Sequence, residues 1–182
     1  MSDIALVNIS NNLVSTNDNE EITANDTEKK ISRFKGYGLI KKFDINLYNK
    51  YDLPARDLLK TKLGDNISDN LDTVYGEDMV ITNNKCKYKF IELQVCTGWI
   101  NEKYPFKYPF IYERKIKFAD TTLFIILNKY MTRGLIFDKK KLVSTKPRRL
   151  KKYSRYFVYE IPWNRIINFE FDSFDFDLLC EY

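Results

Sequence analysis

The chain has 182 residues, of which 44% are hydrophobic, and a formal net charge of +5. This length and composition predict one folded domain with a sizeable core. The sequence contains no histidine, which excludes Ser-His-Asp and Cys-His catalysis and nearly every zinc enzyme.

Targeting and cofactor signals are also absent from the sequence. No apolar run approaches the roughly 20 residues of a membrane-spanning helix, and the N-terminus lacks the pattern of a secretory signal. No GxxxxGK[ST] loop occurs, and Gly36 and Gly38 lack the third glycine of a dinucleotide site. We expect a soluble intracellular protein that is not secreted and contacts no membrane. Any enzymatic chemistry would then fall to carboxylates and lysines. The cysteines form no CxxC pair and predict free or buried thiols: Cys86, Cys96 and Cys180.

Residues 1–31 are polar and acidic and predict a disordered N-terminal arm. Residues 32–182 form the single predicted domain, which ends in an acidic, aromatic tail. Its first element is a helix over residues 52–66, with Pro54 in the first turn and Gly64 at the end. The apolar residues at helical spacing predict its core-facing side: Ala55, Leu58, Leu59 and Leu63.

The sequences DMVIT and KYKFIELQVC, over residues 78–82 and 87–96, predict a β-hairpin that turns at Asn83 and Asn84. The segment over residues 97–118 predicts a loop, with a helical part around 108–117. Later segments predict a strand pair (121–130 and 133–138), a strand (155–161) and a short helix or turn from Pro162. This order indicates an α/β fold with a central mixed β-sheet flanked by helices.

The strand FIELQVC poses a chemical question, because it carries a glutamate and a glutamine within an apolar sequence. Side chains alternate along a strand, so Glu92 and Gln94 share a face that Ile91 and Leu93 do not. A carboxylate on such a face is costly unless a partner compensates it. Asp78 opens the other strand and would lie opposite or diagonal to Glu92. Two carboxylates at that separation suit Mg²⁺, with Mn²⁺ as an alternative, and Gln94 would hold the attacking water.

Asp78 followed by Glu92-Leu93-Gln94 resembles the signature of the PD-(D/E)XK nuclease superfamily, with Gln94 at the usual lysine position and Glu77 at the usual proline. The resemblance implies a restriction-endonuclease-like fold and Mg²⁺-dependent hydrolysis of DNA phosphodiester bonds, most simply by an endonuclease. Asp78 and Glu92 would bind the metal, and Gln94 would complete the catalytic set. Many members are dimers, which leaves a homodimer open. Asp57 lies on the predicted helix, where the family often has another acid, but its spacing indicates a solvent-facing position.

The wider pattern, including ELQVCTGWINEKYPF, YERK and YEIPWNRI, is similar to nuclease-like proteins of large DNA viruses. If the protein is viral, we expect it in the cytoplasm of the host cell or in the virion. The glutamine at the lysine position keeps a second reading open. In that reading the chain is an inactive protein of nuclease fold that binds nucleic acid or a protein partner in a structural or packaging role.

A basic run between residues 139 and 155 contains no acidic residue and predicts contact with the DNA phosphate backbone. Its basic residues are Lys139, Lys140, Lys141, Lys146, Arg148, Arg149, Lys151, Lys152 and Arg155. Solvated loop residues are the alternative interpretation.

Three other groups leave alternatives open. Lys115 and Lys117 either contact substrate, with one of them acting as a displaced active-site lysine, or form the wet face of an amphipathic segment, which we favour. The aromatic residues from Trp99 to Phe110 either stack on bases or, as we favour, belong to the core or a lid. The acidic tail packs on the core, masks the basic surface or recruits a partner.

Overall fold

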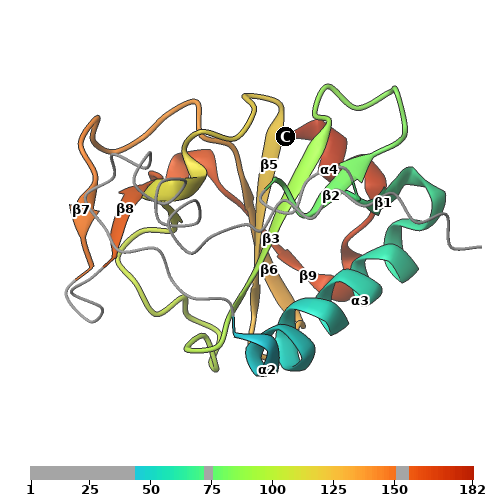
Figure 1. The fold of residues 1–182 in the computed structure, drawn as a ribbon, viewed down its shortest axis with the longest axis horizontal. Helices are drawn as coiled ribbons and strands as arrows, with labels where there is room; N and C mark the ends of the chain where they lie inside the picture. The colour runs from blue at the N-terminus through green and yellow to red at the C-terminus, as the bar shows by residue number, and fades with distance from the viewer. Residues whose placement is uncertain (1–43, 72–75, 151–155) are drawn as a thin grey trace, which may run out of the picture. The chain divides into compact units, whose positions relative to one another are not determined.

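The protein is an α/β protein with a mixed β-sheet at its centre (Figure 1). The computed structural model describes residues 44–71, 76–150 and 156–182, and the arm predicted for residues 1–31 lies outside them. None of the helices in these three ranges is long and apolar enough to cross a membrane.

The central sheet has six strands, and its two middle strands, β3 and β5, run parallel. Every other neighbouring pair is antiparallel. All residues of β5 are buried, as expected for a strand covered on both faces. In spatial order, the strands are β1 (Ile67–Asp69), β2 (Met79–Ile81), β3 (Phe90–Cys96), β5 (Thr122–Asn128), β6 (Arg133–Phe137) and β9 (Ile167–Glu170).

A helical segment precedes the sheet and supplies part of its cover. It consists of α2 (Ile45–Leu47), the π-helical η1 (Tyr48–Asp52) and α3 (Leu53–Leu63). The helix predicted from residue 52 is confirmed as α3, and Gly64 ends it with a φ of 57°. The upstream extension was not predicted; it begins where the Asp44 carboxylate accepts the backbone N–H groups of Asn46 and Leu47.

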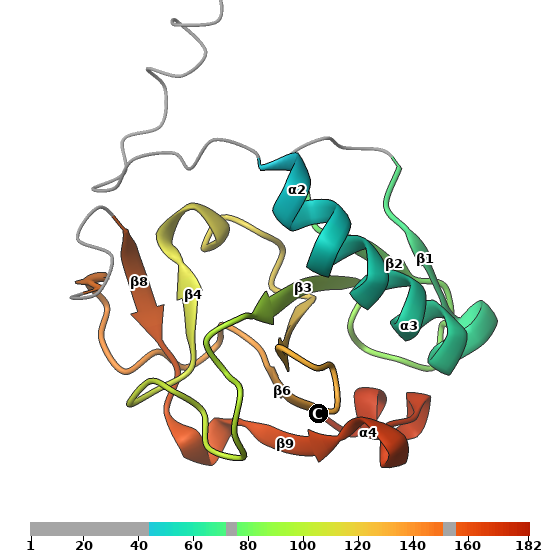
Figure 2. The same cartoon turned by 90° about the horizontal axis from the view of Figure 1, so that it is seen from below.

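The two faces of the sheet are covered differently, as Figures 1 and 2 show. On one face, Ile91 and Leu93 pack in a core with residues of α3 and of the C-terminal helix α4 (Phe176–Glu181). The other face, which includes Cys96, is covered by loops and by a small antiparallel sheet. The strands of that small sheet are β4 (Phe110–Tyr112), β8 (Phe157–Glu160) and β7 (Arg148–Arg149), in that spatial order. Helices therefore flank one face of the central sheet, and the second sheet takes their place on the other.

No α-helix forms over residues 108–117, and the helical part predicted there is limited to one 3-10 turn. The segment forms β4 and then a 3-10 turn, η3 (Glu113–Lys115), before the chain reaches β5. Strand β4 pairs with β8, far away in sequence, and local periodicity does not report such a pairing. The turn predicted at Pro162 is confirmed as η4 (Trp163–Arg165), but β9, which follows it, was not predicted.

The acidic tail packs on the core, which was one of the three alternatives left open by the sequence. Phe171 in η5 (Phe171–Ser173), Phe174 and Leu179 are buried in the helix-covered core. The Asp175 carboxylate accepts the Leu178 N–H and caps α4. The three cysteines are free, as predicted.

Gly134 in β6 offers a test of this packing. It lies directly opposite Phe169 of β9, and a Cβ atom at position 134 would overlap the Phe169 ring. We predict that Gly134→Ala lowers the free energy of unfolding in urea by about 1–3 kcal/mol, because overpacking forces the ring aside. Gly98→Ala is the matched control, since nothing lies within 4 Å of its added Cβ. Equal effects of the two substitutions would contradict this packing.

Candidate active site

Asp78 and Glu92 occupy facing positions at the end of the β2–β3 ladder. The antiparallel register pairs Met79 with Ile91, and continuing it by one residue places Asp78 opposite Glu92. The Asp78 Oδ2 accepts the backbone N–H of Leu93 at 2.9 Å. The hairpin predicted from the sequence is confirmed, and its register places Asp78 and Glu92 on facing positions of the two strands.

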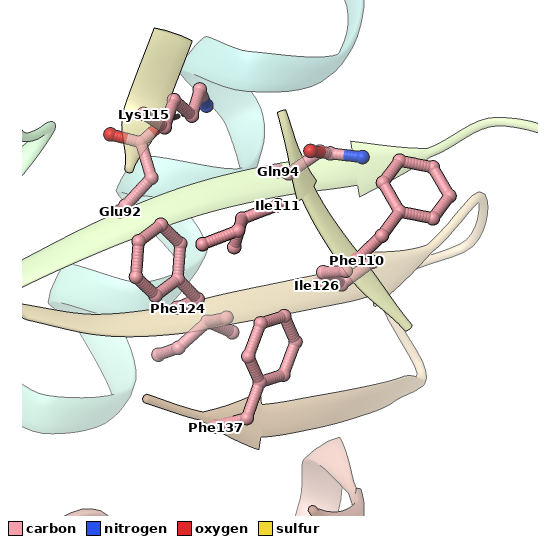
Figure 3. A pocket seen from close by; sticks show the side chains of 9 residues that line it. Glu92, Gln94, Phe110, Ile111, Lys115, Phe124, Ile126 and Phe137 are labelled. Atoms are coloured by element: carbon pink, nitrogen blue, oxygen red, sulfur yellow. Dashed lines mark hydrogen bonds and ion pairs between the residues drawn. The ribbon is translucent and has the colours of Figure 1, made fainter. Parts of the chain in front are cut away.

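Glu92 is buried and forms an ion pair with a lysine that lies 23 positions later in the chain. Glu92 is 5% exposed and Lys115 is 8% exposed. The Lys115 Nζ donates a hydrogen bond to the Glu92 Oε1 (Figure 3). Lys115 ends η3, the turn that follows β4. The solvent-facing position that we favoured for Lys115 is therefore wrong, whereas Lys117 is exposed as expected.

The charge on Lys115 is set by its burial and by a group of neighbouring charges. Burial lowers the pKa of Lys115, while the carboxylates of Asp78 and Asp52 act in the opposite direction and Arg56 adds to the lowering. These groups therefore lie within electrostatic range of one ammonium. With Glu92, the group contains three carboxylates and two cations, so it formally carries one carboxylate in excess. We call these five residues the charged cluster: Asp52, Arg56, Asp78, Glu92 and Lys115.

Arg56 is the second cation of the charged cluster, and it neutralises Asp78. It comes from α3, and its Nη2 donates to the Asp78 Oδ1. Its Nη1 lies 3.6 Å from the Asp69 Oδ1. No pattern in the sequence indicated this role, because α3 and β2 are brought together only by tertiary packing. Asp57 is bound to Lys60 and its side chain is 61% exposed, as the helical spacing predicted.

Gln94 lies in a small cavity of about 10 Å³ that Glu92 and Lys115 also line. That volume is close to the minimum for a single water molecule. The Gln94 carboxamide points toward Phe110, away from the Glu92–Lys115 pair (Figure 3). The structure therefore places Gln94 in the same cavity as Glu92 but not against its carboxylate.

Two side chains from distant segments bind residues 116–122, which connect Lys115 to β5. The Glu77 Oε1 accepts the Ala119 N–H at 3.0 Å and the Thr122 hydroxyl at 2.9 Å. The Lys139 Nζ donates to the carbonyl oxygens of Ile116, at 2.8 Å, and of Phe118. Glu77 adjoins Asp78 in sequence, so the same turn of chain supplies a carboxylate to the charged cluster and fixes the segment that presents Lys115.

The residues of the basic run do not form one uniform surface. Lys139 is 12% exposed and is held by backbone oxygens and by Asp120. Lys140 lies near Asp138, and Arg148 pairs with Glu160. Lys141, Lys146 and Arg149 are exposed and make no ion pair within the described ranges. The remaining predicted DNA contacts lie outside the described residues: Lys151, Lys152 and Arg155.

The aromatic segment before β4 belongs to the core, as we favoured. Trp99, Tyr104 and Phe110 are 3%, 7% and 3% exposed. Trp99 and Tyr104 pack edge to face, with ring centroids 5.3 Å apart. These three rings are therefore not available to stack on bases.

The donor set at the charged cluster fits a divalent cation only if the internal cations move. Within the described ranges, no group of three or more Asp, Glu, His or Cys side chains is arranged to hold a metal. Mg²⁺ is, however, commonly held by one or two carboxylates together with substrate phosphate, and Asp78 and Glu92 supply two. At present, Arg56 and Lys115 neutralise them.

Comparison with protein-family models, with curated proteins and with solved structures finds no match for this chain.

The buried pair predicts a specific stability pattern. We expect Lys115→Met to lower the free energy of unfolding by about 3–5 kcal/mol, because it leaves the Glu92 charge buried without a partner. The double variant Glu92→Leu/Lys115→Met should recover most of that loss, since it removes both charges. Urea unfolding of the two variants measures the difference.

The control is the exposed pair of Arg133 and Glu170, whose side chains are 31% and 59% exposed. Arg133→Met should cost less than about 1 kcal/mol. If Lys115→Met is equally mild, the Glu92–Lys115 pair is not the buried interaction described above.

Proposed function

We propose that this chain is a metal-dependent nuclease of the PD-(D/E)XK type with a restriction-endonuclease-like fold. In this proposal Asp78 and Glu92 hold Mg²⁺ or Mn²⁺, and DNA is the substrate. The observation that carries the proposal is the ammonium of Lys115, which lies on the Glu92 carboxylate and within electrostatic range of Asp78. Lys115 supplies the cation that Gln94 does not provide at the last position of the motif.

The chemistry divides among the residues of the charged cluster. A bound divalent cation would lower the pKa of a water molecule and neutralise charge on the phosphate. Lys115 would contact the phosphate or the attacking water. Because burial lowers the pKa of Lys115, its ammonium can release a proton more readily than that of an exposed lysine. Gln94 would orient a water molecule in the cavity that it shares with Glu92.

Burial of Glu92 places a condition on this mechanism. The Glu92 carboxylate lies beneath Lys115 and beside β4, in a cavity that holds no more than about one water molecule. Access of a phosphate group therefore requires a shift of η3, the turn that carries Lys115. Such movements of active-site segments commonly accompany substrate binding.

Cleavage of circular and linear DNA with Mg²⁺ or Mn²⁺ tests the proposal. We expect Asp78→Asn and Lys115→Met each to slow metal-dependent cleavage by about a hundredfold or more, because each removes a group that stabilises the transition state. Glu181→Gln is the matched control, since it removes an exposed carboxylate on α4. The thermal unfolding midpoint of each variant separates lost chemistry from lost folding.

Nicking of closed circles would identify an endonuclease. Metal-dependent cleavage that survives both substitutions would place the active site elsewhere. A wild type that binds DNA but remains inert with both metals would contradict the nuclease assignment.

A second candidate is an inactive protein of nuclease fold that binds nucleic acid. The observation in its favour is that Asp78 and Glu92 already have cationic partners, so neither carboxylate needs a metal to compensate its charge. In this case Glu92 and Lys115 would serve the packing of β4 against the central sheet, and binding would rest on the exposed basic residues.

DNA binding by these basic residues makes a separate prediction. We expect the triple variant Lys141→Gln/Lys146→Gln/Arg149→Gln to weaken DNA retention and to reduce the slope of log K against log salt by up to about 3, because each lost phosphate contact removes about 0.9. A triple variant at Lys62, Lys85 and Lys129, which lie on other segments, controls for net charge. Equal losses in the two triple variants would show that the basic run provides no specific surface.

A further inference from the structure

Arg56 is shared between two carboxylates, and only one of them belongs to the motif. The Arg56 Nη2 donates to the Asp78 Oδ1, while its Nη1 lies 3.6 Å from the Asp69 Oδ1. The second distance is too long for a good hydrogen bond. The guanidinium is therefore bonded to Asp78 and stands close to Asp69.

The Asp69 carboxylate is incompletely bonded on the side that faces Arg56. Its Oδ2 accepts a hydrogen bond from the Lys60 Nζ at 2.7 Å. Its Oδ1 is buried and accepts no hydrogen bond from any residue that the structure describes. A buried carboxylate oxygen without a donor is unfavourable, and Arg56 is the cation next to it.

Both carboxylate oxygens of Asp78 already accept a hydrogen bond while Arg56 remains bound. Its Oδ2 accepts the Leu93 N–H, and its Oδ1 accepts Arg56. Each oxygen has a second lone pair, but a divalent cation at Oδ1 would meet the positive charge of the guanidinium and therefore compete with it. The Asp69 Oδ1 lies 3.6 Å from the Arg56 Nη1 and can accept the displaced guanidinium. Arg56 can therefore move off Asp78 and still be paired with a carboxylate.

We propose that Arg56 and Asp69 together set the affinity of Asp78 for a divalent cation: the cation takes Asp78, and Arg56 transfers its hydrogen bond to the Asp69 Oδ1. Arg56 is then a competitor of the metal, and Asp69 favours the metal-bound state by receiving Arg56. This inference rests on the proposed metal-binding role of Asp78, and it assigns functions to two residues outside the motif.

The test is a titration with Mn²⁺ alone, in which free Mn²⁺ is measured by electron paramagnetic resonance. We expect Arg56→Gln to bind Mn²⁺ about five- to tenfold more tightly than the wild type, because the competing ion pair is gone. Asp69→Asn should bind about threefold more weakly, because Arg56 loses its alternative acceptor. In the Arg56→Gln background, Asp69→Asn should have no further effect.

Lys62→Gln is the matched control for charge. It removes one cation from the same helix, but its Nζ binds the Asp172 carbonyl oxygen rather than Asp78 or Asp69. Its Mn²⁺ affinity should match that of the wild type. The thermal unfolding midpoint of each variant, with Arg56→Lys as a milder substitution, confirms that the compared proteins are folded.

The outcomes separate this inference from the proposed function. If the wild type binds Mn²⁺ and Arg56→Gln binds it no more tightly, Arg56 is not a competitor and the inference fails, while the nuclease proposal stands. If the predicted order of affinities is found but no variant cleaves DNA, the inference holds and the nuclease proposal fails. If neither the wild type nor Arg56→Gln binds Mn²⁺, both fail.

Discussion

The buried ion pair between Glu92 and Lys115 is the interaction on which the candidate active site depends. An isolated charge in an apolar interior is strongly unfavourable, and a partner with good geometry offsets part of that free energy. Here the partner comes from η3, so the turn after β4 has to lie against the middle of β3. The chemistry of one strand thereby constrains the position of a segment 23 residues away.

That constraint explains features of the fold around it. The connection between the parallel strands β3 and β5 commonly contains a helix, but here it contains β4 and a 3-10 turn. The small sheet covers the Glu92 face, and β4 belongs to it through its pairing with β8. Glu77 and Lys139 then bind the segment that leads from Lys115 into β5. Lys139, which the basic run suggested as a DNA contact, is largely engaged in this internal role.

The local parts of the structure were predictable from the sequence, because neighbouring residues determine them. The alternation in FIELQVC correctly separated Glu92 from Ile91, and hairpin pairing brought Asp78 opposite Glu92. Helical spacing correctly placed Ala55 inside and Asp57 outside. These features need only the periods of strands and helices and the register of one turn.

The parts that were missed are non-local. Lys115 reaches Glu92 because β4 pairs with β8, and Arg56 reaches Asp78 because α3 packs on the sheet. A weak signal for Lys115 was present, since apolar residues precede and follow the charged segment ERK in FIYERKIKF, but the same pattern also fits an amphipathic helix. The short strands β1 and β9 carry too few residues for a clear alternation. Whether the fold and chemistry are those of the nuclease superfamily stays a proposal.

Anomalous diffraction from crystals soaked in Mn²⁺ tests whether Lys115 and Arg56 are internal cations of a metal site. We predict an anomalous peak in contact with the carboxylates of Asp78 and Glu92, with the Lys115 ammonium moved away from Glu92. An intact Glu92–Lys115 pair and no peak at either carboxylate, at a concentration that saturates Mn²⁺ binding in solution, would contradict it. The charged cluster would then be a structural feature of the sheet rather than an active site.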